Sequence, residues 1–267
     1  MTTANSPLTA AQILEIGATL HRALATRIPI APLTETWPGL SIDDAYRIQL
    51  AMVRHRLDAG ERVIGKKIGV TSKVVMDMLD VRQPDFGHLL SGMVHPDGAA
   101  IQVSTLIAPK AEGELAFVLK EDLCGPGVTN ADVLRATDCV LPCFEIVDSR
   151  IRDWKIRIQD TVADNASSGV FVLGDAALDP RGLDLGTVGM TLEKNGEIVA
   201  TGAGAAALGH PANAVAWLAN TLGRLGIALK KGEVILSGSL AAMVPVQAGD
   251  QLRITLGGIG SAGVRFI

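Results

Sequence analysis

Two glutamates, Glu112 and Glu114, stand two residues apart at the head of an apolar run that covers residues 115–119. If this run forms a β-strand, its side chains alternate between the two faces, and both carboxylates project to the same side. A third acid, Glu145, lies inside a second apolar run at residues 140–147. Because buried like charges repel unless a cation or a proton separates them, the placement of these acids constrains any fold of the chain.

Spacing alone leaves two interpretations of the three glutamates open. Carboxylates that converge from neighbouring strands are the ligands that a hard divalent cation such as Mg²⁺ or Mn²⁺ prefers. Alternatively, each glutamate occupies the solvent-facing position of a half-buried strand, where polar residues normally alternate with apolar ones. The first interpretation predicts a metal site, and the second predicts an ordinary surface.

Composition limits the classes of function. The chain has 267 residues, of which 48% are hydrophobic and 19% charged, as is typical of a globular protein. A net charge of −4 argues against nucleic acid or an anionic membrane as the main partner. The three cysteines form no metal-ligand pattern and suit a reducing compartment. No membrane-spanning run and no secretory signal are evident, so we expect a cytoplasmic protein.

The N-terminal part of the chain has helical periodicity. Thr9 and Gln12 resemble a capping box, and apolar residues then recur at helical spacing. Three prolines predict a loop over residues 28–40, and a second helix follows it. Strand-like patterns begin after Glu61. We therefore predict an N-terminal helical segment at residues 1–61 and a catalytic domain at residues 62–267.

The first predicted strand carries two adjacent lysines. Lys66 and Lys67 lie in residues 63–71, so one is expected to face inward and the other to face water. A buried lysine beside carboxylates can hold an anionic substrate or move a proton, although both lysines can instead extend to solvent. A segment that we interpret as turn-rich, residues 83–90, then offers Asp85.

A polar stretch at residues 160–169 contains Asp164 and Ser167, which can bond a ligand or satisfy one another in a turn. The remainder alternates strands with one helix and includes an Asn195-Gly196 hairpin. No glycine-rich fingerprint of a dinucleotide site follows a strand. The pattern predicts an α+β fold whose sheet is rolled or sandwich-like.

Read together, these stretches resemble the hydratase and decarboxylase branch of the fumarylacetoacetate hydrolase superfamily. The resemblance implies that superfamily's mixed β-roll or sandwich with short helices after the N-terminal helical segment. It extends over almost the whole chain in the expected order. The stretches that carry it are residues 65–73, 83–87, 110–117, 145–154, 160–168, 208–211 and 235–239.

The resemblance assigns roles to particular residues. It implies that Glu112, Glu114 and Glu145 bind Mg²⁺ or Mn²⁺. It also identifies Lys67 and Asp85 as candidates for moving a proton and orienting water.

Three further residues are implied to lie around the substrate. Asp164 and Ser167 occupy positions where the superfamily places polar groups. Ser239 follows the glycine of a turn that closes over the bound carboxylate.

The implied activity is hydration of 2-hydroxypenta-2,4-dienoate (2-oxopent-4-enoate) to 4-hydroxy-2-oxopentanoate in the meta-cleavage catabolism of aromatic compounds. The alternatives are decarboxylation of 4-oxalocrotonate and C–C bond hydrolysis of the acylpyruvase type. The last alternative needs a His–Glu pair, and no histidine here has a glutamate within four residues. The branch also implies a homo-oligomer and an association with a partner enzyme of the pathway.

Overall fold

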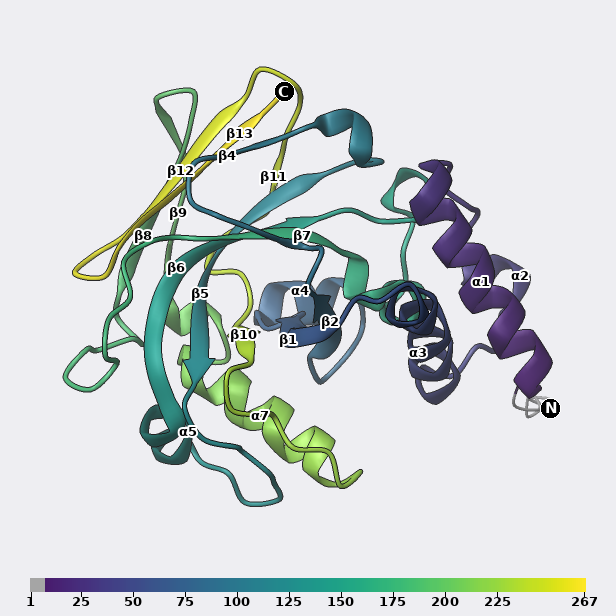
Figure 1. Ribbon diagram of the computed structural model, residues 1–267, viewed down its shortest axis with the longest axis horizontal. Helices are drawn as coiled ribbons and strands as arrows, with labels where there is room; N and C mark the ends of the chain where they lie inside the picture. Colours follow the sequence, from purple (N-terminus) through teal and green to yellow (C-terminus); the bar gives the residue numbers. More distant parts are fainter. Residues whose placement is uncertain (1–7) are drawn as a thin grey trace.

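The computed structural model describes residues 8–267. Residues 1–7, which belong to the stretch expected to lack a secretory signal, lie outside the described residues. Two curled β-sheets form the body of the molecule, and the N-terminal helices pack at one side of it (Figure 1). Within residues 8–267, no helix is both long and apolar enough to cross a membrane.

Three helices open the chain: α1 (Ala10–Thr26), α2 (Leu33–Thr36) and α3 (Ile42–Asp58). Thr9 and Gln12 form the predicted capping box at α1. The prediction of a continuous loop over residues 28–40 was wrong, because α2 lies within it. Pro32 precedes this turn of helix, and Asp160 accepts hydrogen bonds from the backbone N–H and hydroxyl of Thr34. A distant acid therefore supports a helix that local sequence disfavours.

The larger sheet has eight strands, and seven of them follow the order β2-β1-β10-β5-β6-β7-β3, with β11 paired to β5. Its central pair, β5 and β6, carries the predicted acidic positions and runs antiparallel. The strands are β1 (Val63–Gly69), β2 (Asp85–Leu90), β3 (Val94–His95), β5 (Lys110–Leu119), β6 (Thr137–Val147), β7 (Ser168–Leu173), β10 (Val234–Leu236) and β11 (Val244–Pro245).

The smaller sheet has five strands in the order β4-β13-β12-β8-β9. Asn195 and Gly196 join β8 to β9 with φ of 56° and 88°, as the predicted two-residue hairpin turn requires. The strands are β4 (Ala99–Ile101), β8 (Gly189–Lys194), β9 (Glu197–Ala203), β12 (Gln251–Leu256) and β13 (Gly260–Phe266).

The main apolar core lies between the two sheets and under α7 (Pro211–Gly223), and includes Phe117, Phe144 and Leu218. Helix α7 is rich in alanine, begins with Pro211 at the first helical position and packs closely on the larger sheet (Figure 1). The remaining α-helices are short: α4 (Lys73–Met78), α5 (Asn130–Ala136) and α6 (Ile158–Ala163). This packing leaves the opposite face of β5 and β6 for polar side chains.

The α+β architecture with N-terminal helices and curled sheets is confirmed. The division at residues 61 and 62 stays a prediction. A smaller core joins α1 and α3 to α6, which belongs to the second part of the chain. The turn-rich interpretation of residues 83–90 was wrong from Asp85 onward, because Asp85–Leu90 forms β2. Pairing with β1 along its length outweighs the local turn preference of Pro84 and Asp85.

Candidate active site

Glu112, Glu114 and Glu145 converge on one face of the β5–β6 pair. Glu112 lies directly opposite Glu145 in the ladder, and Glu114 follows two residues along the same face. One carboxylate oxygen from each lies within 4.8 Å of the others. Glu114 and Glu145 are completely buried, and Glu112 is half-buried. The solvent-facing interpretation was therefore wrong for this acidic triad.

Several oxygens of the acidic triad accept no hydrogen bond from the described residues. Both oxygens of Glu145 and Oε1 of Glu114 accept no hydrogen bond, and only Oε2 of Glu114 accepts one, from the Gly238 N–H at 2.8 Å. Burial and the charge of Glu145 raise the pKa of Glu112 to about 7 and that of Glu114 well above its usual range. Three converging carboxylates with unmet acceptor capacity fit a hard divalent cation.

Lys67 projects from β1 toward the acidic triad. Its Nζ lies 3.2 Å from Oε2 of Glu145 and donates a hydrogen bond to the carbonyl of Ala166 at 3.0 Å. Burial lowers the pKa of Lys67, but the charges of Glu145 and Asp85 outweigh that effect and raise it above its usual value. Lys67 is thus a fully protonated ammonium next to an acid.

Asp85, at the start of β2, lies on the same side of the β1–β2 pair. Burial raises its pKa, although the charge of Lys67 opposes that shift. Its Oδ1 has no hydrogen-bond partner among residues 8–267. A methyl group on Gly69 would lie 2.3 Å from this oxygen and 3.2 Å from Lys67 Nζ. Gly69 therefore leaves the room that lets the two groups share one site.

An unusual backbone segment places the carbonyl that binds Lys67. Asn165, Ala166 and Ser167 have successive φ values of 53°, 51° and 52°, which non-glycine residues rarely adopt. The Asn165 side chain accepts from the His88 N–H at 2.8 Å and donates to the His88 carbonyl at 2.9 Å. A methyl group on Gly87 would lie 2.4 Å from the Asn165 carbonyl. Strand β2 therefore holds this segment against Lys67.

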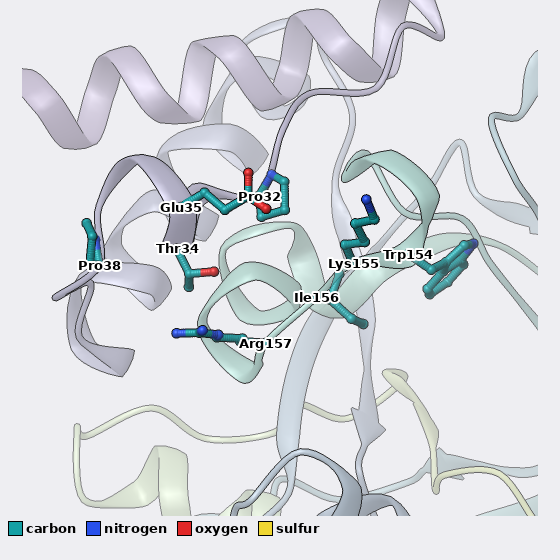
Figure 2. A pocket seen from close by; sticks show the side chains of 8 residues that line it. All are labelled: Pro32, Thr34, Glu35, Pro38, Trp154, Lys155, Ile156 and Arg157. Carbon is teal, nitrogen blue, oxygen red and sulfur yellow. The ribbon is translucent and has the colours of Figure 1, made fainter.

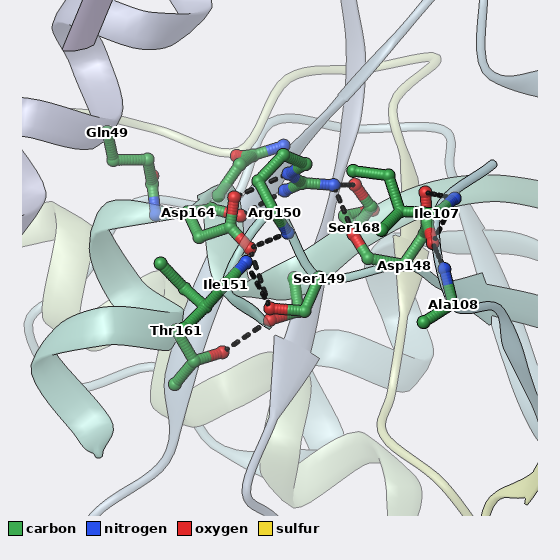
Figure 3. A network of polar contacts seen from close by, with 12 residues as sticks. Gln49, Ile107, Ala108, Asp148, Ser149, Arg150, Ile151, Thr161, Asp164 and Ser168 are labelled. Carbon is green, nitrogen blue, oxygen red and sulfur yellow. Dashed lines mark hydrogen bonds and ion pairs between the residues drawn. The ribbon is translucent and has the colours of Figure 1, made fainter. Parts of the chain in front are cut away.

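Asp164 belongs to a second buried network, centred on Arg150 (Figure 3). One Asp164 oxygen pairs with the Arg150 guanidinium, and the other accepts from Ser149 Oγ at 3.2 Å and the Arg150 N–H at 2.9 Å. Arg150 also donates to the carbonyl of Ser168 at 2.8 Å. Burial raises the pKa of Asp164 to about 6 against the opposing charge of Arg150. Both carboxylate oxygens are thus engaged within the protein.

The other two predicted substrate contacts also bond to the protein. Ser167 Oγ lies 3.1 Å from Thr161 Oγ1, and Ser239 Oγ donates to the Ala241 carbonyl at 2.6 Å. The turn before Ser239 reaches the acidic triad through the Gly238 backbone, at a φ of 101°. The substrate contacts of Asp164, Ser167 and Ser239 stay predictions.

Lys66 contradicts the expectation that one of the two lysines faces water. Its side chain is buried on the opposite face of β1, where Nζ donates to both oxygens of Glu233 at 2.9 and 3.1 Å. Opposite it in the ladder stands His88, whose Nδ1 lies 3.0 Å from Gln49 Oε1. Burial and the charge of Lys66 lower the pKa of His88 to about 4.

Sequence reasoning missed Arg150 and Ala166 as parts of the site. Nothing in residues 148–168 signalled that Arg150 is completely buried, since arginine is usually exposed. Ala166 contributes only a carbonyl, which leaves no trace in residue type. The Asn165 side chain forms its hydrogen bonds with His88 of β2, which the polar character of its segment did not indicate.

One cavity, of about 580 Å³, lies away from these residues, between α2 and residues 154–157 (Figure 2). Trp154 and Arg157 line it together with Glu35. Across the Trp154 ring, Lys110 Nζ lies 4.2 Å from the ring centroid. None of the predicted site residues lines this cavity.

The family model and the most similar curated proteins agree on one family for this chain. The C-terminal domain of fumarylacetoacetate hydrolases matches residues 69–267. A 2-hydroxypent-2,4-dienoate hydratase of Pseudomonas putida is 64% identical over 81% of this chain and 98% of its own. A 2-hydroxyhexa-2,4-dienoate hydratase of Comamonas testosteroni is 58% identical over 94% of this chain and 96% of its own.

Among solved structures, the 4-oxalocrotonate decarboxylase of Pseudomonas putida G7, complexed with magnesium and adipate, superposes with a TM-score of 0.95. It is 39% identical and covers 98% of this chain and 100% of its own. The same enzyme has also been solved with calcium and acetate, with a TM-score of 0.94. The match spans the helical and the sheet-forming parts of the chain.

Proposed function

The chain belongs to the fumarylacetoacetate hydrolase family, and from that premise we propose that it is a hydro-lyase acting on 2-hydroxypenta-2,4-dienoate. It adds water to this dienoate and forms 4-hydroxy-2-oxopentanoate in the breakdown of aromatic compounds. The hydratases that share more than half of their residues with this chain support the assignment. The observation that carries it is the buried acidic triad, which has oxygens that accept no hydrogen bond and lies next to the ammonium of Lys67.

We propose that Glu112, Glu114 and Glu145 hold Mg²⁺ or Mn²⁺. Their oxygens converge, and three of the four buried oxygens of Glu114 and Glu145 have no hydrogen-bond partner. The bound cation supplies Lewis-acid stabilisation of the negative charge that develops on a substrate oxygen. Magnesium and calcium in the structures of the decarboxylase support a hard cation here.

Lys67 and Asp85 are the proposed proton-handling pair. Hydration requires that the enol proton leaves the C2 hydroxyl and that C5 gains a proton. Hydroxide then adds to C4 and a second proton to C3. Asp85 has an unpaired Oδ1, and burial raises its pKa, so it is the candidate that accepts and returns a proton. Lys67 stays protonated and orients an oxygen of the substrate or of water.

We propose different tasks for the three remaining candidates. Ser239 lies in the turn whose backbone contacts Glu114, which suits a contact to the substrate carboxylate. Asp164 and Ser167 hold the segment that presents the Ala166 carbonyl to Lys67, and any contact that they make to substrate is secondary to this task.

Product analysis tests this function most directly. The purified protein with Mg²⁺ or Mn²⁺ is offered 2-hydroxypenta-2,4-dienoate and 4-oxalocrotonate in parallel. Hydration predicts 4-hydroxy-2-oxopentanoate from the first substrate and no release of CO2 from the second. Release of CO2 without water uptake would instead assign the decarboxylase activity, which the TM-score of 0.95 makes the second candidate.

We further propose that the enzyme is a cytoplasmic homo-oligomer that associates with a partner enzyme of its pathway. The three cysteines are free, as a reducing compartment requires. Light scattering of the purified protein measures its size, and a monomeric mass would rule out the oligomer.

A further inference from the structure

A second cavity, of about 610 Å³, is lined by Thr71, by residues of α4 and by residues of the 205–209 segment, and no residue of the acidic triad lines it. Thr71, which follows β1 and lines this cavity, packs against the turn that contacts Glu114: a methyl group on Gly238 would lie 2.4 Å from Thr71 Oγ1. Because the Gly238 N–H donates to Glu114, one pair of packed residues links the cavity to the acidic triad.

The wall of this cavity combines apolar side chains with a charged cluster. Met76, Val81 and Leu208 supply apolar surface. Lys73 and Arg82 are the two cations that line the cavity. Without a neighbouring acid, the two cations would attract a second carboxylate at the far end of a substrate.

Asp77 compensates both cations. Its carboxylate accepts from Lys73 Nζ at 2.8 Å and from Arg82 Nη1 at 3.4 Å, and it also lines the cavity. The hydrogen bond from Lys73 lowers the pKa of Asp77, so the carboxylate is ionised at neutral pH. A second acid, Asp80, lies 3.8 Å from Arg82 but does not line the cavity. The charged cluster is therefore close to neutral.

We propose that Asp77 is a specificity-determining residue that keeps the cavity for an uncharged C5 substituent and excludes a second carboxylate. Selectivity of this kind needs an element that acts against the competing ligand as well as one that favours the correct one. The apolar wall accepts hydrogen or a short alkyl group at C5, while Asp77 repels a carboxylate and occupies the cations that would bind it. The inference rests on the proposed function, because it takes a substrate that is anchored at the triad to extend past Thr71 into this cavity.

The test compares Asp77→Asn with the matched control Asp80→Asn. Asparagine preserves the shape of both side chains, and it tolerates the φ of 51° at Asp80. For each protein, kcat/KM is measured for 2-hydroxypenta-2,4-dienoate and for the dicarboxylate 2-hydroxyhexa-2,4-dienedioate. Inhibition by adipate is measured against inhibition by hexanoate, which lacks the second carboxylate.

In Asp77→Asn, the preference for the monocarboxylate is expected to fall about fivefold, the range of one solvent-exposed charge pair, and adipate inhibition is expected to strengthen by a similar factor relative to hexanoate. Asp80→Asn should stay within about twofold of the wild type, since Asp80 lies farther from Arg82. Adding Arg82→Gln to Asp77→Asn should reverse much of the gain for the dicarboxylate.

Unchanged ratios in Asp77→Asn, or an equal change in Asp80→Asn, would overturn the inference. If the wild type hydrates neither dienoate, the proposed function fails, and calorimetric binding of adipate and hexanoate to the wild type and to Asp77→Asn then decides the role of Asp77. If the wild type hydrates the monocarboxylate and Asp77→Asn changes no ratio, only the inference fails.

Discussion

Each face of the β1–β2 pair carries a buried lysine next to an acid, but the two faces differ in how completely their charged groups are hydrogen-bonded. On one face, Lys67 and Asp85 meet the acidic triad, and several carboxylate oxygens there have no hydrogen-bond partner in the described residues. On the other face, Lys66 donates to both oxygens of Glu233, and His88 pairs with Gln49. Both lysines are buried, so burial does not distinguish them.

The difference lies in how completely the charges are paired. A buried charge with full partners keeps the fold in one arrangement, whereas unpaired buried oxygens destabilise the fold and persist where a ligand completes them. The Arg150–Asp164 network resembles the Lys66 face, because its carboxylate oxygens are all engaged. Three buried clusters of charged residues therefore have two kinds of task. The acidic triad with Lys67 forms the ligand-binding centre, and the Lys66–Glu233 and Arg150–Asp164 pairs support the fold.

Replacing Lys67 sharpens the comparison with the largest expected effect. We expect Lys67→Met to lower kcat at least about a hundredfold, because it removes the positioned ammonium that orients and stabilises a reacting oxygen. Lys66→Met is the matched control, and its kcat should stay within about tenfold of the wild type if the protein is folded. Steady-state hydration of the dienoate measures both. Equal losses in the two variants would remove the distinction between the two faces.

The stability of the Lys66 face gives the second prediction. Lys66→Met should lower the free energy of unfolding by about 3 kcal/mol, since it leaves Glu233 charged and without its partner. The double variant Lys66→Met/Glu233→Leu should recover most of this loss, because no unpaired charge remains. Urea denaturation measures both variants. A double variant that is as unstable as the single one would show that the pair itself is not the cause.

His88 predicts a smaller, pH-dependent effect. Gln49 Nε2 donates to two backbone carbonyls, so its Oε1 accepts from His88 Nδ1, and the folded state holds His88 neutral. The pKa of His88 falls from 6.5 to about 4 on folding. Between these values the unfolded chain binds a proton that the folded chain does not, so stability is full above the unfolded pKa and falls with pH below it.

Protonation of His88 in the unfolded chain should lower the free energy of unfolding by about 2 kcal/mol between pH 7 and pH 5. His88→Gln, which stays neutral, should lack that part of the loss. Urea denaturation of both proteins at the two pH values measures the difference. Identical pH dependence in wild type and variant would mean that His88 is not held neutral.

Regular local patterns were readable from the sequence. The period of two placed Glu112 and Glu114 on one face, the capping box placed α1, and Asn195-Gly196 placed a hairpin. Each depends on residues close together in the chain, whose geometry the backbone fixes. The apolar run around Glu145 indicated a third acid, and the superfamily resemblance favoured the metal site over the surface interpretation of the three glutamates.

Pairing over long distances was not readable. The partner of Lys66 is 167 residues away, so no local pattern could show that this lysine is buried. The superfamily resemblance implied that Asp164 lies near the substrate, which stays a prediction, and no local pattern showed that Arg150 engages Asp164 within the protein. Whether a buried oxygen has a partner depends on the folded arrangement of several strands, and this property separates the acidic triad from its supports.

Calorimetric titration of the metal-free protein with Mg²⁺ and Mn²⁺ tests the central claim most directly, because it measures binding without reference to any substrate. We expect one site per chain in the wild type, and no measurable binding at that site in Glu145→Gln, which removes a ligand and one negative charge. Asp164→Asn serves as the control, and if it remains folded it should keep the site. Binding of equal affinity in wild type and Glu145→Gln, or no binding in the wild type, would contradict the assignment of the acidic triad as the metal centre.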